Sequence, residues 1–205
     1  MNTTKKQLLT VLLCAGFTFY ASASAALNIG DTAPALNATD IFGKKVDLHA
    51  IKGVTVLEWS NPQCPFVKKH YTSNNMQKLQ ESAKKDGVTW IMINSSAPGK
   101  QGHMDHEQAK KLISEQKASP AHVILDADGA IGKAFGAKTT PHMYVIHANH
   151  TIAYMGAIDS KNGVNPDEIP SSTNYVQGAL NALKAGTTPN PSATAPYGCG
   201  IKYAH

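Results

Sequence analysis

Cys64 is the residue whose type and setting most clearly allow chemistry. It lies in "WSNPQCPFVKKHY", residues 59–71, between an apolar run that reads "VTVLEW" and a segment that Pro65 opens. Because proline is favoured at the first helical position, Cys64 is expected at a helix start, where unpaired N–H groups and the helix dipole favour a thiolate. This setting predicts a nucleophilic thiol. The alternatives are a buried inert cysteine, a metal ligand and one half of a structural disulfide.

A Thr-Pro pair is the second feature of this kind. Thr140-Pro141 stands directly before the strand pattern "HMYVIH". A proline that opens an interior strand predicts a constrained loop with a cis peptide bond, here beside Cys64. His142 follows and is expected to face the active site or its rim, where it could orient a substrate or a proton. A simple surface histidine is the alternative.

Histidines raise the question of a metal ion. His103 and His106 stand at a helical spacing, and His70 lies six residues after Cys64. No Cys-x-x-Cys pair with the spacing of a zinc site accompanies them. We therefore expect neither a metal site nor a cofactor.

Alternating strands and helices must position these residues. Strand patterns lie at "VTVLEWS", "GVTWIMINSS", "AHVILDADG" and "TTPHMYVIHANHTIAYMGAI", the last as two strands joined by a turn. Helical patterns lie between them, from Pro65 to about Lys85, at "HEQAKKLISEQK" and at "AIGKAFGA", and a last amphipathic helix is "STNYVQGALNALKAG". A hairpin with its turn at Asp40–Gly43 precedes them all. This order predicts an α/β sandwich with a mixed central sheet flanked by helices, in which "VTVLEWS" is central.

The two ends of the chain differ from this central part. Residues 1–25 have a basic start, an apolar stretch and small residues, which is typical of a secretory signal peptide rather than a membrane span. Residues 26–185 are then one domain, and residues 186–205 are a Pro/Ser/Thr-rich tail without periodicity. The expected location is the periplasm, or outside the cell, where disulfides are tolerated. The chain has no arginine and no basic cluster, so nucleic-acid binding is set aside.

At this point the sequence resembles the thioredoxin superfamily, in its redoxin branch of the alkyl hydroperoxide reductase/thiol-specific antioxidant type. "GDTAPALNATDIFGKKVDL" is similar to the redoxin entry hairpin, "VLEWSNPQCPFV" to the active-site strand and helix start, and "GAKTTPHMYVIHANHTIAYMGAID" to the cis-proline loop and terminal hairpin. The resemblance implies a thioredoxin-like fold and thiol–disulfide exchange, or reduction of an oxidised thiol, through Cys64. Thr140 and Pro141, with Pro65 and His142 nearby, would hold an extended substrate segment.

Glu58 matches a buried acid of thioredoxins that lies six residues before the attacking cysteine. A carboxyl group in a central apolar strand should have a raised pKa, which would let it exchange protons with a nearby thiol. A partly exposed glutamate on an edge strand is the alternative.

The sequence also departs from the family pattern. The frame reads Cys64-Pro65-Phe66-Val67, so the second thiol of Cys-x-x-Cys is missing. Leu57 and Asn61 stand where a typical peroxiredoxin would have proline and threonine, and no arginine is present to stabilise peroxide. A peroxidase with non-standard peroxide activation is therefore an alternative, and so is a non-catalytic binding protein of the same fold.

The predicted signal peptide carries Cys14, so Cys64 and Cys199 are the two cysteines of the remaining chain. Cys199 stands in "PYGCGIKY", between two glycines that permit close backbone approach. An attacking cysteine needs a second thiol to resolve its mixed disulfide, so we predict that the tail folds back and that Cys199 forms a reversible disulfide with Cys64. A static structural bond, or a free thiol that pairs between molecules, are the alternatives. The expected partners are a thiol or disulfide substrate, protein or small molecule, and a thiol electron donor.

Overall fold

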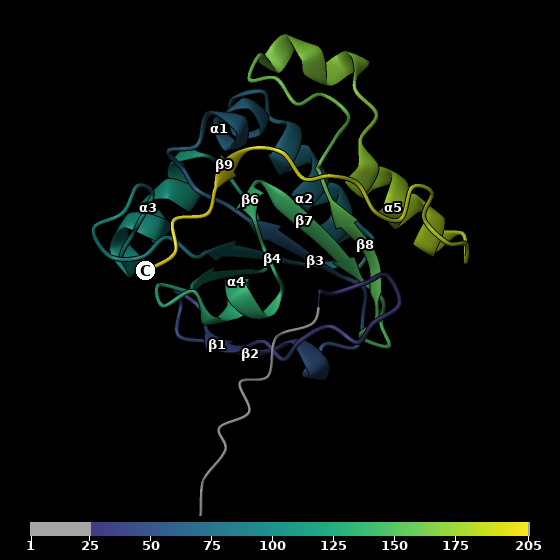
Figure 1. Cartoon of the computed structure of the whole chain (residues 1–205), viewed down its shortest axis with the longest axis horizontal. Coiled ribbons are helices and arrows are strands. Elements are labelled where there is room, and N and C mark those ends of the chain that lie inside the picture. Colours follow the sequence, from purple (N-terminus) through teal and green to yellow (C-terminus); the bar gives the residue numbers. More distant parts are fainter. Residues whose placement is uncertain (1–25, 205) are drawn as a thin grey trace, which may run out of the picture.

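A mixed five-stranded sheet forms the centre of the protein (Figure 1). The computed structural model describes residues 26–204, so the predicted signal peptide lies outside the described residues. The strand order is β5-β4-β3-β7-β8, and β3 runs parallel to β4 and antiparallel to β7. The position predicted for "VTVLEWS", at the centre of the sheet, is therefore confirmed. The strands are β3 (Thr55–Trp59), β4 (Thr89–Asn94), β5 (His122–Leu125), β7 (His142–Ile146) and β8 (Ile152–Gly156).

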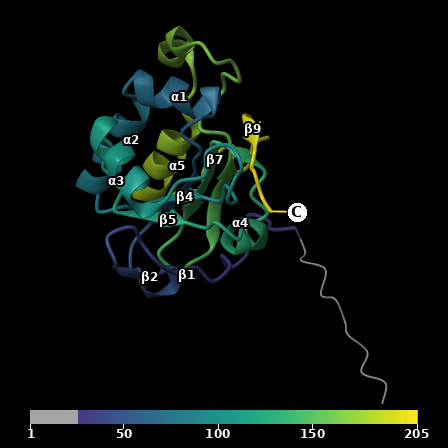
Figure 2. The same cartoon turned by 90° about the vertical axis from the view of Figure 1, so that its left-hand side faces the viewer.

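Helices cover both faces of this sheet (Figure 2). One face is covered by α1 (Pro65–Thr72), α2 (Asn75–Lys85), α3 (His106–Glu115) and α5 (Tyr175–Lys184). The other face is covered by α4 (Ala130–Ala134), by the hairpin of β1 (Asn37–Thr39) and β2 (Lys45–Asp47), and by the short helix η1 (Leu48–Ala50). All five residues of β3 are buried, because the sheet is covered on both sides. Burial of each large apolar side chain contributes roughly 1.5–3 kcal/mol.

The single helix predicted from Pro65 to about Lys85 is wrong, because the chain breaks it into α1 and α2. Asn74 adopts a left-handed conformation, with φ of 60°. The hydroxyl of Ser73 donates to the carbonyl of Lys69 at 2.8 Å and so competes with helix continuation. The short polar residues of "TSNN" thus end one helix and begin another.

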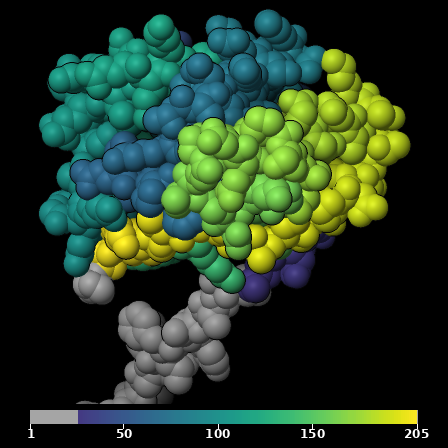
Figure 3. Space-filling view, turned by 90° about the horizontal axis from the view of Figure 1, so that it is seen from above, coloured from purple at the N-terminus to yellow at the C-terminus, as the bar shows by residue number. Residues whose placement is uncertain are grey.

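Some short elements and pairings, among them η1, have no counterpart in the sequence-based prediction. The short helix η2 (Pro166–Ser171) belongs to an excursion that contacts α1. The strand β6 (Thr139–Thr140) pairs with β9 (Cys199–Gly200), which belongs to the tail. Viewed from above, the yellow tail runs alongside the green excursion and the blue α1 segment (Figure 3). The tail therefore closes over the end of the sheet where β3 leads into α1.

Within residues 26–204, no helix has the length and apolar character needed to cross a membrane.

Candidate active site

Cys64 lies directly before α1, between the central strand and its first helix. The carbonyl of Cys64 accepts hydrogen bonds from the N–H groups of Val67 and Lys68, at 3.1 and 2.9 Å. Pro65 then supplies the first helical residue, where its missing N–H costs nothing. The N–H of Cys64 donates to the carbonyl of Asn61 at 3.0 Å. These bonds fix the thiol at the positive end of the helix, as the sequence predicted.

The Thr140–Pro141 loop lies against this thiol. The peptide bond between the two residues is cis, which is the isomer expected from the sequence. The Sγ atom of Cys64 lies 3.0 Å from the carbonyl oxygen of Thr140, to which the thiol donates. Two segments 76 residues apart thus meet at one sulfur atom.

The tail brings the second thiol to the same place. In the antiparallel pair of β6 and β9, Thr140 lies opposite Cys199. The Thr140 hydroxyl adds a bond of 3.4 Å to the carbonyl of Cys199. Both cysteines are free thiols, Cys64 fully buried and Cys199 partly buried, and each thiol shifts the pKa of the other. The predicted return of the tail to Cys64 is therefore observed, whereas the disulfide itself stays a prediction.

The two thiols differ in acidity. Burial raises the pKa of Cys64, but hydrogen bonds to the ionised sulfur, from the Cys199 thiol, from the Thr140 side chain and from the Val67 N–H, together outweigh burial, so the pKa lies below its ordinary value. Burial, the hydrogen bond with Cys64 and the Cys64 charge raise the pKa of Cys199 to about 11. Of the two thiols, Cys64 is thus the one that ionises first, and Cys199 stays protonated. The pair therefore combines one thiol that ionises readily with one that stays protonated.

Alkylation against pH measures this difference directly. We expect the midpoint for Cys64 to fall below about 8.5, the ordinary value of a free thiol. Replacing Cys199 with alanine removes one donor and should raise that midpoint, whereas serine keeps a hydroxyl donor and should raise it less. Peptide mapping with iodoacetamide assigns each rate to its cysteine. A titration midpoint of Cys64 at or above about 8.5 would contradict the prediction that Cys64 is a nucleophile.

Glu58 is completely buried, and its carboxylate is held by other side chains. One oxygen accepts from Tyr71 at 2.8 Å, and the other accepts from Trp90 at 2.9 Å and from Gln80 at 3.3 Å. Among the described residues, Glu58 forms no hydrogen bond with either cysteine. The edge-strand alternative is therefore wrong. Proton transfer to Cys64 has no direct contact to support it and stays a prediction.

The burial of Glu58 has an effect that depends on pH. Burial raises the pKa of its carboxyl group, against the hydrogen bonds from Trp90 and Tyr71. Above the ordinary value of 4.5 the unfolded chain ionises more readily than the folded one, so the folded state loses stability as pH rises towards the folded pKa. Glu58→Gln removes this loss. We expect the free energy of unfolding of this variant to rise relative to that of the parent protein as the pH increases above 4.5.

Urea unfolding at several pH values tests this prediction for Glu58. The matched control is Glu81→Gln, which changes an exposed glutamate of α2. The control should follow the parent curve at every pH. Parallel curves for Glu58→Gln and the parent would contradict the prediction.

A buried polar cluster that sequence reasoning missed anchors the tail beside the thiols. The hydroxyl of Tyr197, two residues before Cys199, donates to the Asp159 carboxylate at 2.5 Å. The ammonium group of Lys69 lies 4.0 Å from the same carboxylate and 5.2 Å from the centre of the Tyr197 ring. Both charged side chains have no exposed surface. No spacing in the sequence relates residues 69, 159 and 197, so only the fold reveals the cluster.

A comparison with known families decides the class of protein. The model of the AhpC/TSA family matches residues 29–155, which is more than half of the chain. The chain belongs to the AhpC/TSA family. It is a thioredoxin-like redox protein, which confirms the predicted redoxin branch and the expected class of thiol-dependent oxidoreductases. A search of curated proteins gives no match.

Solved structures share the fold of this AhpC/TSA chain. An uncharacterized conserved protein from Geobacillus kaustophilus is 26% identical, with a TM-score of 0.72 over 86% of this chain and 93% of that one. A hypothetical protein from Sinorhizobium meliloti 1021 is 19% identical, with a TM-score of 0.71 over 88% and 97%. The thioredoxin domain of a thiol-disulfide oxidoreductase from Bacteroides vulgatus is 19% identical, with a TM-score of 0.53 over 71% and 98%. The thioredoxin-like fold predicted from the sequence is confirmed.

His142 does not lie where the sequence placed it. Its ring packs against Tyr144, with 4.8 Å between ring centres, and Tyr144 belongs to the apolar cluster on the face of the sheet opposite Cys64. The side chain is buried, and burial followed by the charge of Lys138 lowers its pKa to about 4. The expectation that His142 faces the active site or its rim is therefore corrected, because residues 142 and 144 share one face of β7. A surface position is equally excluded.

The histidine pair at the start of α3, with His103 in the preceding loop and His106 as the first helical residue, gathers no ligand set. His103 contacts the carbonyl of Ser96 through Nδ1, at 3.0 Å. Among residues 26–204, no group of three or more His, Cys, Asp or Glu side chains is arranged to hold a metal ion.

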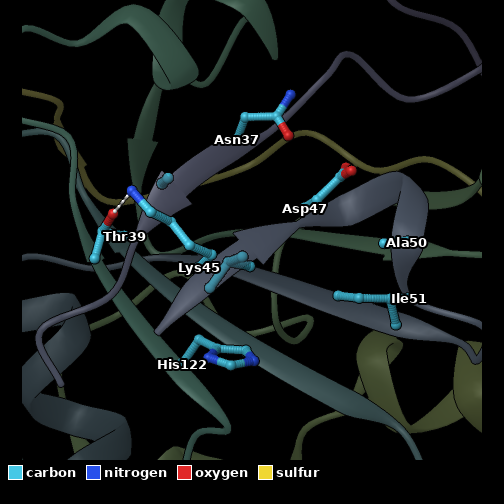
Figure 4. A pocket seen from close by; sticks show the side chains of 9 residues that line it. Asn37, Thr39, Lys45, Asp47, Ala50, Ile51 and His122 are labelled. Carbon is cyan, nitrogen blue, oxygen red and sulfur yellow. Dashed lines mark hydrogen bonds between the residues drawn. The ribbon is translucent and has the colours of Figure 1, made fainter. Parts of the chain in front are cut away.

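A hollow in the described surface lies away from the two thiols. It has a volume of about 630 Å³ and is formed by the β1–β2 hairpin and His122 (Figure 4). His122 begins β5, at the amino ends of the parallel strands, whereas Cys64 follows the carboxyl end of β3. The hollow is therefore separate from the chemistry of Cys64.

Proposed function

We propose that this chain is an exported thiol–disulfide oxidoreductase in which Cys64 attacks and Cys199 resolves. The observation that carries the proposal is the pairing of β6 with β9, which sets Cys199 opposite Thr140 while the Cys64 thiol binds the Thr140 carbonyl. The second thiol of a Cys-x-x-Cys frame is absent, since the buried Val67 stands in its place. The tail supplies the missing thiol from 135 residues further along the chain.

The proposed reaction has two exchange steps. The Cys64 thiolate attacks one sulfur of a substrate disulfide, forms a mixed disulfide and expels the other substrate sulfur as a thiolate, which takes up a proton. Loss of the Cys64 charge removes one of the causes that raise the pKa of Cys199. Cys199 then ionises, attacks Cys64 and releases the second substrate thiolate. The substrate gains two electrons, the Cys64–Cys199 pair loses them, and an external dithiol restores the pair.

Exported location and domain limits are parts of the same proposal. The composition of residues 1–25 supports removal of a signal peptide, and an oxidising compartment suits an exchangeable disulfide. Residues 26–185 would then be the redox domain, and residues 186–205 would be the tail that carries Cys199. Mass spectrometry of the protein from separated cell fractions would show whether the chain starts near residue 26 in the periplasm.

A thiol peroxidase is the second candidate, because the AhpC/TSA match favours it. In that reaction the Cys64 thiolate would take one oxygen from a hydroperoxide to form a sulfenic acid, and Cys199 would displace water to form the same disulfide. The chain contains no arginine that could stabilise the bound peroxide. This absence favours disulfide exchange.

A comparison of two oxidants tests the proposed function. The reduced protein is mixed with one equivalent of a peptide disulfide or of hydrogen peroxide, and the reaction is stopped with acid. We expect the peptide disulfide to be consumed with formation of the Cys64–Cys199 bond, and turnover when dithiothreitol is in excess. A reaction about 100-fold faster with peroxide would favour the peroxidase. Failure of both oxidants to link the two cysteines would overturn both candidates.

A further inference from the structure

Tyr197 and Gly198 connect the buried polar cluster to the resolving thiol. Beyond the bond to Asp159, the Tyr197 hydroxyl lies 3.2 Å from Nε2 of His70, and its ring lies 5.9 Å from the ring of Phe66. Burial lowers the pKa of the His70 imidazole to about 4. The ring is therefore neutral at neutral pH and forms no ion pair with the Asp159 carboxylate. The phenol is therefore held by hydrogen bonds on two sides and by an aromatic contact.

Asp159 is itself fixed by the groups that face it. Its Oδ1 atom accepts from the backbone N–H of Lys161 at 3.0 Å as well as from Tyr197. The ammonium group of Lys69 neutralises the carboxylate and donates to the carbonyl of Lys161 at 2.6 Å. The cluster thus joins α1, the segment after β8 and the tail. A bond from a phenol to a buried carboxylate is charge-assisted, which makes it one of the stronger hydrogen bonds.

Gly198 fits where no other residue would. A Cβ atom at this position would lie 2.0 Å from the carbonyl oxygen of Thr140 and 2.7 Å from its carbon. These are backbone atoms of the loop that binds the Cys64 thiol, so they cannot move aside. The φ angle of 131° also disfavours a side chain. Close contact between the tail and Thr140 therefore depends on glycine directly before Cys199.

Docking of the tail has two opposed consequences for the chemistry. It holds the Cys199 thiol against Cys64, which favours the second exchange step. Cys64 has no exposed surface while the tail is docked, so a bulky disulfide needs the tail to move away before it reaches the thiolate. The first step is therefore limited by the same contact that speeds the second.

We propose that Tyr197 and Gly198 are positioning residues for Cys199, acting through the Asp159–Lys69 pair and through the Thr140 loop, and that they set the balance between access to Cys64 and resolution of its mixed disulfide. This inference rests on the proposed function. It assigns to the tail a second task, which is to shield Cys64 from bulky reagents until the tail undocks. Weaker docking then accelerates attack and slows resolution.

Two tail variants of the full chain, each with a matched control, test this balance. Gly198→Ala places a methyl group against the Thr140 backbone, and Gly200→Ala makes the same change where no atom lies within 4 Å. Tyr197→Phe removes only the hydroxyl, and Tyr175→Phe makes the same change in α5. One readout is the rate at which a polyethylene-glycol maleimide labels Cys64. The other is the stability of the Cys64–Cys199 disulfide in glutathione buffers.

In Gly198→Ala and Tyr197→Phe we expect the maleimide to label Cys64 about 10-fold faster. We also expect the equilibrium constant for formation of the Cys64–Cys199 disulfide to be about 10-fold lower. A hydrogen bond to a charged group is worth about 1.5–3 kcal/mol, and 1.4 kcal/mol is tenfold. Both controls should stay within about twofold. Unchanged readouts in both tail variants, or readouts that fall together, would overturn the positioning role. If the parent protein forms no Cys64–Cys199 disulfide at all, the proposed function fails, and the labelling rates still decide whether these residues dock the tail.

Discussion

Replacing Cys199 with serine is expected to leave a protein that attacks one disulfide and then stops. The Cys64 thiolate keeps its helix start and a hydroxyl donor from the tail, so the first exchange step proceeds. Without a second thiol, the mixed disulfide at Cys64 has no internal route to release. Turnover with a peptide disulfide and dithiothreitol should fall at least about 100-fold, because resolution then relies on external thiol instead of a thiol held in contact.

Mass spectrometry of acid-stopped reactions checks this result. The Cys199→Ser chain should carry one substrate peptide on Cys64, whereas Cys64→Ser should carry none. Added monothiol should release the peptide and restore part of the turnover. Turnover of Cys199→Ser equal to that of the parent protein would show that Cys199 has no part in the reaction.

Replacing Lys69 with methionine should be the most destabilising change near the site. Methionine has a similar length but no charge, so the buried Asp159 carboxylate would lose its cation. Removal of one partner from a buried ion pair costs about 3–5 kcal/mol, since the other charge remains in a poorly solvated place. We expect this loss in the free energy of unfolding, together with weaker docking of Tyr197.

Urea unfolding of the reduced protein measures the cost. Lys68→Met is the matched control, because the neighbouring lysine is exposed. The control should change the free energy of unfolding by no more than about 0.5 kcal/mol. Equal unfolding midpoints for the two variants would contradict the role of Lys69 as the partner of Asp159.

Local sequence signals were sufficient for the chemistry that depends on one segment. Pro65 after Cys64 marks a helix start, and an uninterrupted apolar run before it marks a central strand, so the setting of the nucleophile could be predicted. The Thr140-Pro141 pair likewise predicted a constrained loop with a cis peptide bond. These features are short-range, and each depends on backbone preferences that neighbouring residues decide.

Other features depend on contacts between segments that are distant in the sequence, and these could not be predicted from local patterns. Nothing near Lys69 shows that it is buried against Asp159, because a lysine in "VKKHY" has the pattern of a solvated helix face. Glu58 was expected to exchange protons with Cys64. Its carboxylate instead accepts hydrogen bonds from Tyr71 of α1 and Trp90 of β4. The tail lacks periodicity, so only the two glycines that flank Cys199 indicated that it could fold back closely onto Cys64.

The most direct test of the account is the redox state of the two cysteines in the intact protein. The chain is equilibrated in buffers of increasing oxidising strength, trapped with acid and mapped without reduction. We predict a Cys64–Cys199 bond within one chain that forms and opens as a two-electron couple, and that dithiothreitol reduces while the protein stays folded. Two free thiols under oxidising conditions, or a bond that opens only in denaturant, would contradict it.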